Sequence, residues 1–182
     1  MKILPHTLTA ALMLLVAAAG ATAMPTPPSD NLLHPTPPPW YETWKAGYGC
    51  SLTKTGGGET TVLRQTLPAG FTSGNHSWQL RVPVQPGETY TFTVQYQLEN
   101  VGAAMAQFHF ADAGGKLMDY RKYRLSTQTL SGTETGWKSL TYTFTAPADV
   151  SSVMIALRLN SPGTVYWNTP TLETVSPASD NS

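Results

Sequence analysis

The chain has 182 residues, 12% of them charged, and a formal net charge of 0 at pH 7. This length suits a single folded domain rather than two. A nearly neutral surface argues against a strongly charged partner such as nucleic acid, whereas its many Thr, Ser, Gln and Asn residues suit a neutral polar ligand such as a sugar.

The first 23 residues predict an exported protein. Lys2 supplies a positive charge, residues 10–19 form a short apolar run, and Ala21-Thr22-Ala23 has the A-x-A form of a cleavage site. The run is too short to span a bilayer, so residues 1–23 are interpreted as a secretory signal peptide rather than as a membrane anchor. We expect a monomer that starts at Met24, is secreted to the periplasm or the extracellular space, and stays off the membrane.

Residues 24–39 predict an extended N-terminal arm, because seven of these sixteen residues are proline. Proline cannot donate a backbone hydrogen bond and favours polyproline II. Asn31-Leu32-Leu33 interrupts the prolines, and its leucines are predicted to dock at a sheet edge. Cys50 is the only cysteine, which excludes an intramolecular disulfide; we expect a buried thiol rather than an intermolecular bridge.

Within residues 40–174, several segments have apolar residues at every second position and are separated by turns rich in Pro, Gly and Asp. This alternation predicts an all-β, antiparallel β-sandwich, because each strand then buries one face. No apolar pattern persists at helical spacing over three turns, and residues 175–182 are expected to form a disordered tail. The predicted inward rows are Trp78, Leu80, Val82 and Val84; Tyr90, Phe92, Val94, Tyr96 and Leu98; Ala104, Ala106, Phe108 and Phe110; Leu140, Tyr142 and Phe144; and Val153, Ile155, Leu157 and Leu159.

Four pieces of sequence occur in a recognisable order: Val82–Phe92, Phe110–Lys116, Gly136-Trp137 followed by Phe144–Ala148, and Val165–Asn168. Together with Asn31-Leu32-Leu33 as the opening, they resemble the jelly-roll carbohydrate-binding modules found beside cellulases and xylanases (families 4, 9 and 22, galactose-binding-like fold). The resemblance covers residues 31–173. It implies a jelly-roll sandwich that binds carbohydrate and performs no chemistry.

Members of these families often hold a structural calcium ion with a Phe-Glu near the opening and an Asp-Asp in the last strand, since calcium needs several oxygen ligands. This chain departs from both motifs. The last strand has Asn168-Thr169, and prolines replace the opening, although Glu42 remains near it. We therefore expect no cofactor and no metal, with a calcium site as the alternative.

Carbohydrate binding requires planar polar side chains and aromatic faces on one surface. The outward rows offer Gln95, Gln97, Gln107, His109 and Arg158, which we expect on one sheet face as the binding site; the alternative is a solvated face without a ligand. Trp40, Trp44, Tyr120 and Tyr123 lie in irregular segments and are the candidate stacking platforms. Trp78 and Trp137 are expected in the core.

Two further sequence patterns each allow more than one functional interpretation. The segment 119–124, Asp-Tyr-Arg-Lys-Tyr-Arg, predicts either a site that binds an acidic sugar through charge-assisted hydrogen bonds or an exposed loop strand without a ligand. Gln107-Phe108-His109 is similar to the Gln-x-His motif of jelly-roll alginate lyases, but the Arg-rich strand of those enzymes is missing. A glycosidase needs two carboxylates flanking a cleft, and the candidates here fall at turns. We therefore predict no enzyme, with a structural or adhesive surface domain as the main alternative and a lyase using Gln107 and His109 as the lesser one.

Overall fold

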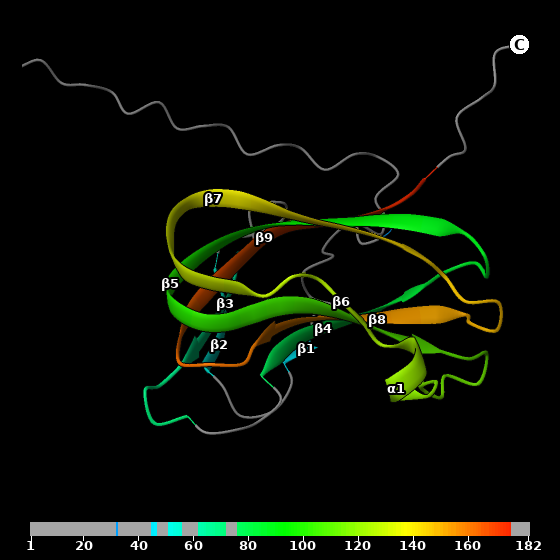
Figure 1. The fold of residues 1–182 in the computed structure, drawn as a ribbon, viewed down its shortest axis with the longest axis horizontal. Coiled ribbons are helices and arrows are strands. Elements are labelled where there is room, and N and C mark those ends of the chain that lie inside the picture. Colours follow the sequence, from blue (N-terminus) through cyan, green and yellow to red (C-terminus); the bar gives the residue numbers. More distant parts are fainter. Residues whose placement is uncertain (1–31, 33–44, 47–50, 56–61, 72–75, 176–182) are drawn as a thin grey trace, which may run out of the picture.

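The computed structural model describes residues 32, 45–46, 51–55, 62–71 and 76–175, and it is an antiparallel β-sandwich (Figure 1). The all-β prediction is therefore confirmed. The predicted signal peptide, Trp40, Glu42, Trp44, Cys50 and the tail from residue 176 lie outside the described residues. The elements are β1 (Lys45–Ala46), β2 (Ser51–Thr55), β3 (Val62–Leu67), β4 (Ser77–Pro83), β5 (Thr89–Ala111), α1 (Tyr120–Tyr123), β6 (Leu125–Ser126), β7 (Leu130–Thr145), β8 (Ser152–Leu159) and β9 (Gly163–Thr174).

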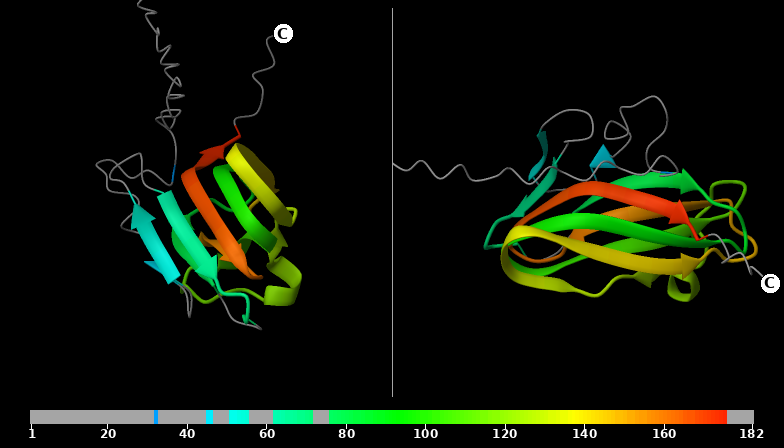
Figure 2. Two further views of the ribbon diagram at one scale, coloured as in Figure 1. Left: turned by 90° about the vertical axis from the view of Figure 1, so that its left-hand side faces the viewer. Right: turned by 90° about the horizontal axis from the view of Figure 1, so that it is seen from above.

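The long strand β5 belongs to both layers of the sandwich. Its second half, from Ala104 on, pairs with β8 and β6, and β8 pairs with β4 and then β1; these strands form the first layer. Its first half pairs with β9 and β7, and β9 continues to β3 and β2; these strands form the second layer. The left panel of Figure 2 shows the strands of the second layer side by side. The sheet is thus continuous and curls over itself through β5.

A bulge allows β5 to pass between the layers. The pairing with β7 shifts register between Leu98 and Ala104, and Asn100 has a positive φ of 52°. An extra residue in one strand bends it and increases its twist. The alternating rows of residues 90–98 and 104–110 were predicted as two successive strands, and the structure shows one strand with a bend.

The inward rows of both layers meet in one hydrophobic core. Phe92 of the second layer contacts Phe108 of the first, with ring centroids 5.4 Å apart. The predicted rows are buried as expected, except that Tyr96 and Tyr142 are partly buried at the margin. Trp78 is also buried as predicted. The backbone N–H of Leu32 donates to the carbonyl of Leu172 at 2.8 Å, so this residue of the arm docks on β9.

The prediction that Trp137 closes the core is wrong, because its side chain is 38% exposed. Trp137 lies in the middle of β7, where residues 131–139 extend past the core and none is buried. Among the described residues, no helix is long and apolar enough to cross a bilayer.

Candidate functional site

The five outward side chains predicted to share a face lie on two faces. Gln107, His109 and Arg158 belong to the first layer, whereas Gln95 and Gln97 belong to the second. Because the inward rows of both layers point into one core, their outward rows point in opposite directions. The prediction of a single face is therefore wrong. The reason is the continuity of β5, which carries its two halves to opposite sides of the sandwich.

Gln107 and Arg158 form the centre of the first face. Arg158 Nη1 donates a 2.6 Å hydrogen bond to Gln107 Oε1, across the pairing of β5 and β8. Gln107 is 5% exposed, and Arg158 is half-buried although it lies on an outward row. Among the described residues, Arg158 Nε has no hydrogen-bond partner. The arginine is thus oriented by a neutral amide, and its buried Nε donor is unsatisfied among the described residues.

His109 extends this arrangement toward α1. Its ring stacks on that of Tyr120, with centroids 5.7 Å apart and planes 16° apart. The guanidinium carbon of Arg124 lies 4.6 Å from the centroid of the Tyr120 ring, and Arg124 Nη1 donates to the Tyr120 hydroxyl. Tyr120 is 50% exposed. We call the contiguous set formed by Arg158, Gln107, His109, Tyr120 and Arg124 the polar strip.

Burial and charge hold the pKa of His109 below its ordinary value of 6.5. Desolvation is the main cause, and the positive charges of Arg158 and Arg124 add to it. Burial likewise lowers the pKa of Arg158, with a smaller lowering contribution from Arg124. His109 is therefore a neutral imidazole at pH 7, able to donate one hydrogen bond and accept another.

The single turn of α1 places Tyr120 beside His109. Asp119 precedes the turn, and its side chain accepts a 2.9 Å hydrogen bond from the Arg121 N–H, as an N-terminal cap does. The chain then enters β6, where Ser126 pairs with Gln107. This pairing brings Arg124, next to β6, to the edge of the strip. The segment 119–124 is thus a capped helical turn rather than the alternative of a loop strand.

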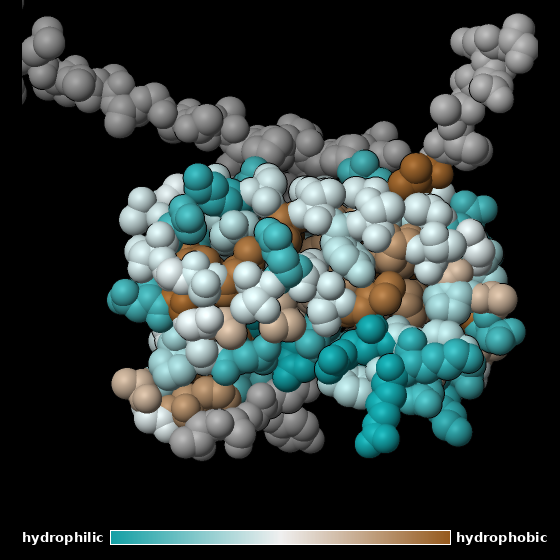
Figure 3. All heavy atoms as spheres, in the orientation of Figure 1, coloured by the Kyte–Doolittle hydropathy of each residue, from teal (hydrophilic) through white to brown (hydrophobic). Residues whose placement is uncertain are grey.

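Tyr123, the other aromatic residue of α1, is placed differently. Its ring is partly buried and packs against the hydrophobic core, with Lys122 Nζ 4.7 Å from its centroid. Tyr120 is therefore the better exposed platform of the two. Figure 3 shows hydrophilic side chains gathered over α1.

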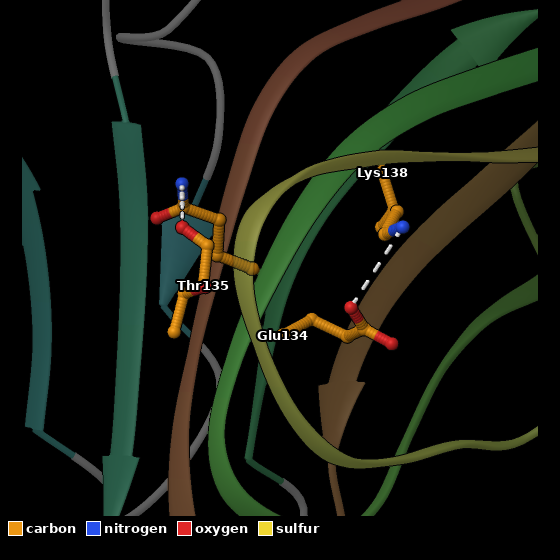
Figure 4. Close-up of polar contacts among 4 residues, drawn as sticks. Glu134, Thr135 and Lys138 are labelled. Atoms are coloured by element: carbon orange, nitrogen blue, oxygen red, sulfur yellow. Dashed lines mark hydrogen bonds and ion pairs between the residues drawn. The ribbon is translucent and has the colours of Figure 1, made fainter.

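The opposite face, on the second layer, is rich in threonine. Threonine hydroxyls pair across β5 and β7 at 2.9 Å (Thr89 and Thr145), 3.1 Å (Thr91 and Thr143) and 3.3 Å (Thr93 and Thr141). Gln97 Nε2 donates to the Thr135 carbonyl at 3.1 Å, near Glu134 and Lys138 (Figure 4). The polar groups of this face are therefore largely hydrogen-bonded to one another.

A second set of buried polar residues lies apart from the predicted binding residues. Gln65 and Asn168 are fully buried, and His76 is 3% exposed. Gln65 lies in β3 between the buried residues Leu63 and Leu67, and its burial depends on which face of β3 turns toward β8. No local pattern predicts that contact.

The alternative of a calcium site finds no carboxylate cluster among the described residues. In that part of the chain, no group of three His, Cys, Asp or Glu side chains could hold a metal. Asn168 occupies the last-strand position as a buried amide, which lacks the charge of a carboxylate. Glu42, the remaining candidate, lies outside the described residues.

No protein-family model matches this chain, and no curated protein matches it in sequence. Solved structures with the same fold include several carbohydrate-binding modules. The CBM22-1–GH10 part of Clostridium thermocellum endo-1,4-β-D-xylanase 10B, complexed with xylohexaose, has a TM-score of 0.57 at 12% identity, over 75% of this chain and 27% of that one. The CBM22-2 xylan-binding domain of Paenibacillus barcinonensis Xyn10C has a TM-score of 0.54 at 10% identity, over 73% of this chain and 92% of that one.

The fold also occurs in a larger protein of another kind. The enzymatically active domain of bacteriophage CBA120 tailspike protein 4 has a TM-score of 0.55 at 12% identity, over 73% of this chain. This chain spans 19% of that tailspike domain and 27% of the xylanase fragment. At such identities the likeness shows a shared fold, in agreement with the resemblance found in the sequence. It does not transfer a ligand or an activity.

Proposed function

We propose that this protein binds a polysaccharide or oligosaccharide through the polar strip on its first layer. The observation that carries the proposal is the Arg158–Gln107 hydrogen bond beside the stacked His109–Tyr120 pair. It presents planar hydrogen-bonding groups and an exposed aromatic ring on one face, which is what sugar recognition requires. The fold shared with carbohydrate-binding modules supports the same function.

We further propose that the binding is non-catalytic. Described carboxylates such as Glu88, Asp112 and Asp149 lie at or beside turns rather than on the strip, so no pair of acids flanks a bound sugar there. A lyase would use the neutral His109 as a base and would release unsaturated products that absorb in the ultraviolet. We expect no increase in absorbance on alginate or pectin. An increase that disappears in His109→Ala would establish the lyase instead.

Affinity electrophoresis on xylan, β-glucan, pectin and alginate tests the binding itself. Arg158→Ala and Gln107→Ala should each weaken binding by about 1–3 kcal/mol, because each leaves polar groups of the complex unpaired. Gln97→Ala is the matched control, since Gln97 lies on the opposite face, and it should bind like the unmodified protein. Retardation by none of these polysaccharides, with the fold intact, would contradict carbohydrate binding.

The competing proposal is a structural or adhesive surface domain. It is favoured by the threonine pairs on the second layer, which form a polar face whose hydroxyls are already paired. Such a domain would contact other proteins and no glycan. Thr91→Ala combined with Thr143→Ala would then reduce surface adhesion, while Arg158→Ala would leave it unchanged.

We also propose that the protein acts outside the cytoplasm as a secreted monomer. Support comes from Ala21-Thr22-Ala23 following the apolar run. Secreted material should have the intact mass of a chain that begins at Met24, and sedimentation should give one copy. Retention of the full-length chain in the membrane would contradict export.

A further inference from the structure

The polar strip concentrates positive charge without an acidic partner. Arg158 and Arg124 lie at its two ends, and among the described residues neither forms an ion pair with a carboxylate. An ion pair does join Lys138 and Glu134, at 4.0 Å, but that pair lies on β7. The strip therefore offers two guanidinium groups whose charge is not neutralised locally.

The pKa values of His109 and Arg158 are lowered first by burial and then by neighbouring positive charge. The charges that act on His109 are those of Arg158 and Arg124, and both lower its pKa. Burial is the main cause of the lowered pKa of Arg158, and the positive charge of Arg124 lowers it further. Two acids, Asp119 and Asp149, act on the exposed Lys122, and neither is among the groups that shift the pKa of His109 or Arg158.

Without a ligand, the half-buried charge of Arg158 reduces the stability of the folded protein. A half-buried charge is normally paired, because removal from water penalises the charged form. Here the partner of Arg158 is the neutral amide of Gln107, and Arg158 Nε has no hydrogen-bond partner in the part of the chain that the structure describes. An anionic ligand would offset this cost with its opposite charge, whereas the hydroxyls of a neutral sugar would offset it less.

The two guanidinium groups specify the kind of anion. A guanidinium is planar and matches a carboxylate with two parallel hydrogen bonds, which makes it well suited to the acid group of a sugar. Arg121 and Lys122 extend the positive charge along α1 beyond the strip. We infer that the polar strip binds an acidic polysaccharide built of uronic acids, with sugar carboxylates against Arg158 and Arg124; this inference depends on the proposed carbohydrate-binding function.

The experiment compares ligands that differ only in their acid group. Binding of the secreted chain is measured by calorimetry to polygalacturonate and to carboxyl-reduced polygalacturonate, which keeps the backbone and lacks the charge. Xylan and β-glucan represent neutral polysaccharides, and κ-carrageenan represents a sulfated one. Polygalacturonate should bind at least about tenfold more tightly than its reduced form, as expected for the loss of one charge-assisted hydrogen bond.

Three variants assign the effect to residues. Arg158→Gln and Arg124→Gln should each weaken polygalacturonate binding about tenfold, and any loss of binding to the reduced polymer should be clearly smaller. Arg64→Gln is the matched control, because Arg64 lies on β3 of the other layer, near the Tyr166 ring. Arg124 is exposed, so its variant remains informative if Arg158→Gln impairs folding.

The outcomes separate this inference from the proposed function. Tight binding to xylan or β-glucan with no preference for polygalacturonate would overturn the inference and leave carbohydrate binding intact. Tighter binding to κ-carrageenan than to polygalacturonate would overturn the assignment to carboxylates. Binding to no glycan at all would overturn the proposed function and, with it, the inference.

Discussion

Trp167 Nε1 donates a 2.7 Å hydrogen bond to Gln65 Oε1, and both side chains are fully buried. Gln65 Nε2 donates in turn to the carbonyls of His76 and Leu157, each at 3.1 Å. Gln65 belongs to β3 in the second layer, whereas Leu157 belongs to β8 in the first. This one amide therefore connects the two layers through the interior.

Replacing Gln65 should destabilise the sandwich. Gln65→Ala removes three buried hydrogen bonds, leaves the Trp167 N–H without its acceptor, and opens a cavity. We expect a loss of about 2–4 kcal/mol in the free energy of unfolding, measured by urea denaturation. Gln97→Ala, on a partly exposed glutamine, should change it by less than about 0.5 kcal/mol. Equal effects of the two variants would contradict the bridging role of Gln65.

Gly163 should tolerate no larger residue. Its φ is 129°, and a Cβ at this position would lie 2.6 Å from the Asn100 carbonyl oxygen, so substitution strains the backbone next to the β5 bulge. Gly163→Ala should cost about 1–3 kcal/mol in a thermal or urea unfolding measurement. Gly136→Ala is the control, because a Cβ there meets no atom within 4 Å. Similar stability for both variants would argue against the close contact between β9 and the bulge.

Two phenylalanines test the assignment of the inward rows. Phe92 is fully buried and Phe144 is 4% exposed, and both pack against the ring of Phe108. Truncation of either to Ala should cost about 3–5 kcal/mol. Thr91→Ala, at the adjacent outward position, should cost at most about 1 kcal/mol, because it removes one exposed cross-strand pair. An unchanged melting temperature for both phenylalanine variants would mean that the inward and outward rows are interchanged.

The strands could be predicted from the sequence because alternation is a local property. Phe92 and Phe108 each lie in a row of apolar residues at every second position, and both are in the core. Trp137 shows the limit of this reasoning. It is apolar and lies next to a clean row, but β7 continues past the edge of the core at that point, and local sequence does not encode where the opposing layer ends.

The candidate site could be predicted only in part. Gln107, His109 and Arg158 were identified from their outward positions, and the structure brings them together. Gln95 and Gln97 were grouped with them because the rows of residues 90–98 and 104–110 were expected to be neighbouring strands of one sheet, whereas the bend at Asn100 places them in different layers. The position of Arg124 depends on β6, whose two residues are too few to produce a pattern.

Acidic pH should reduce stability through the histidines. Burial and the charge of Arg158 lower the pKa of His76 and of His109 in the folded protein, and Arg124 adds to the effect on His109. The unfolded chain, with an ordinary pKa of 6.5, therefore binds more protons than the folded one at mildly acidic pH. The contribution of the two histidines to the free energy of unfolding should be complete above pH 6.5. It should decrease as the pH drops from 6.5 toward the lower pKa values that they have in the folded protein.

The same titration can be followed at His109 itself. By NMR, its imidazole should titrate below 6.5, and the midpoint should rise in Arg124→Gln because a neighbouring positive charge is removed. Arg64→Gln, on the other layer, should leave the midpoint unchanged. Polygalacturonate should raise the midpoint, since carboxylates placed beside Arg158 and Arg124 favour the protonated ring. A midpoint at or above 6.5 in the free protein, unmoved by Arg124→Gln, would mean that the charges of the polar strip do not act on His109.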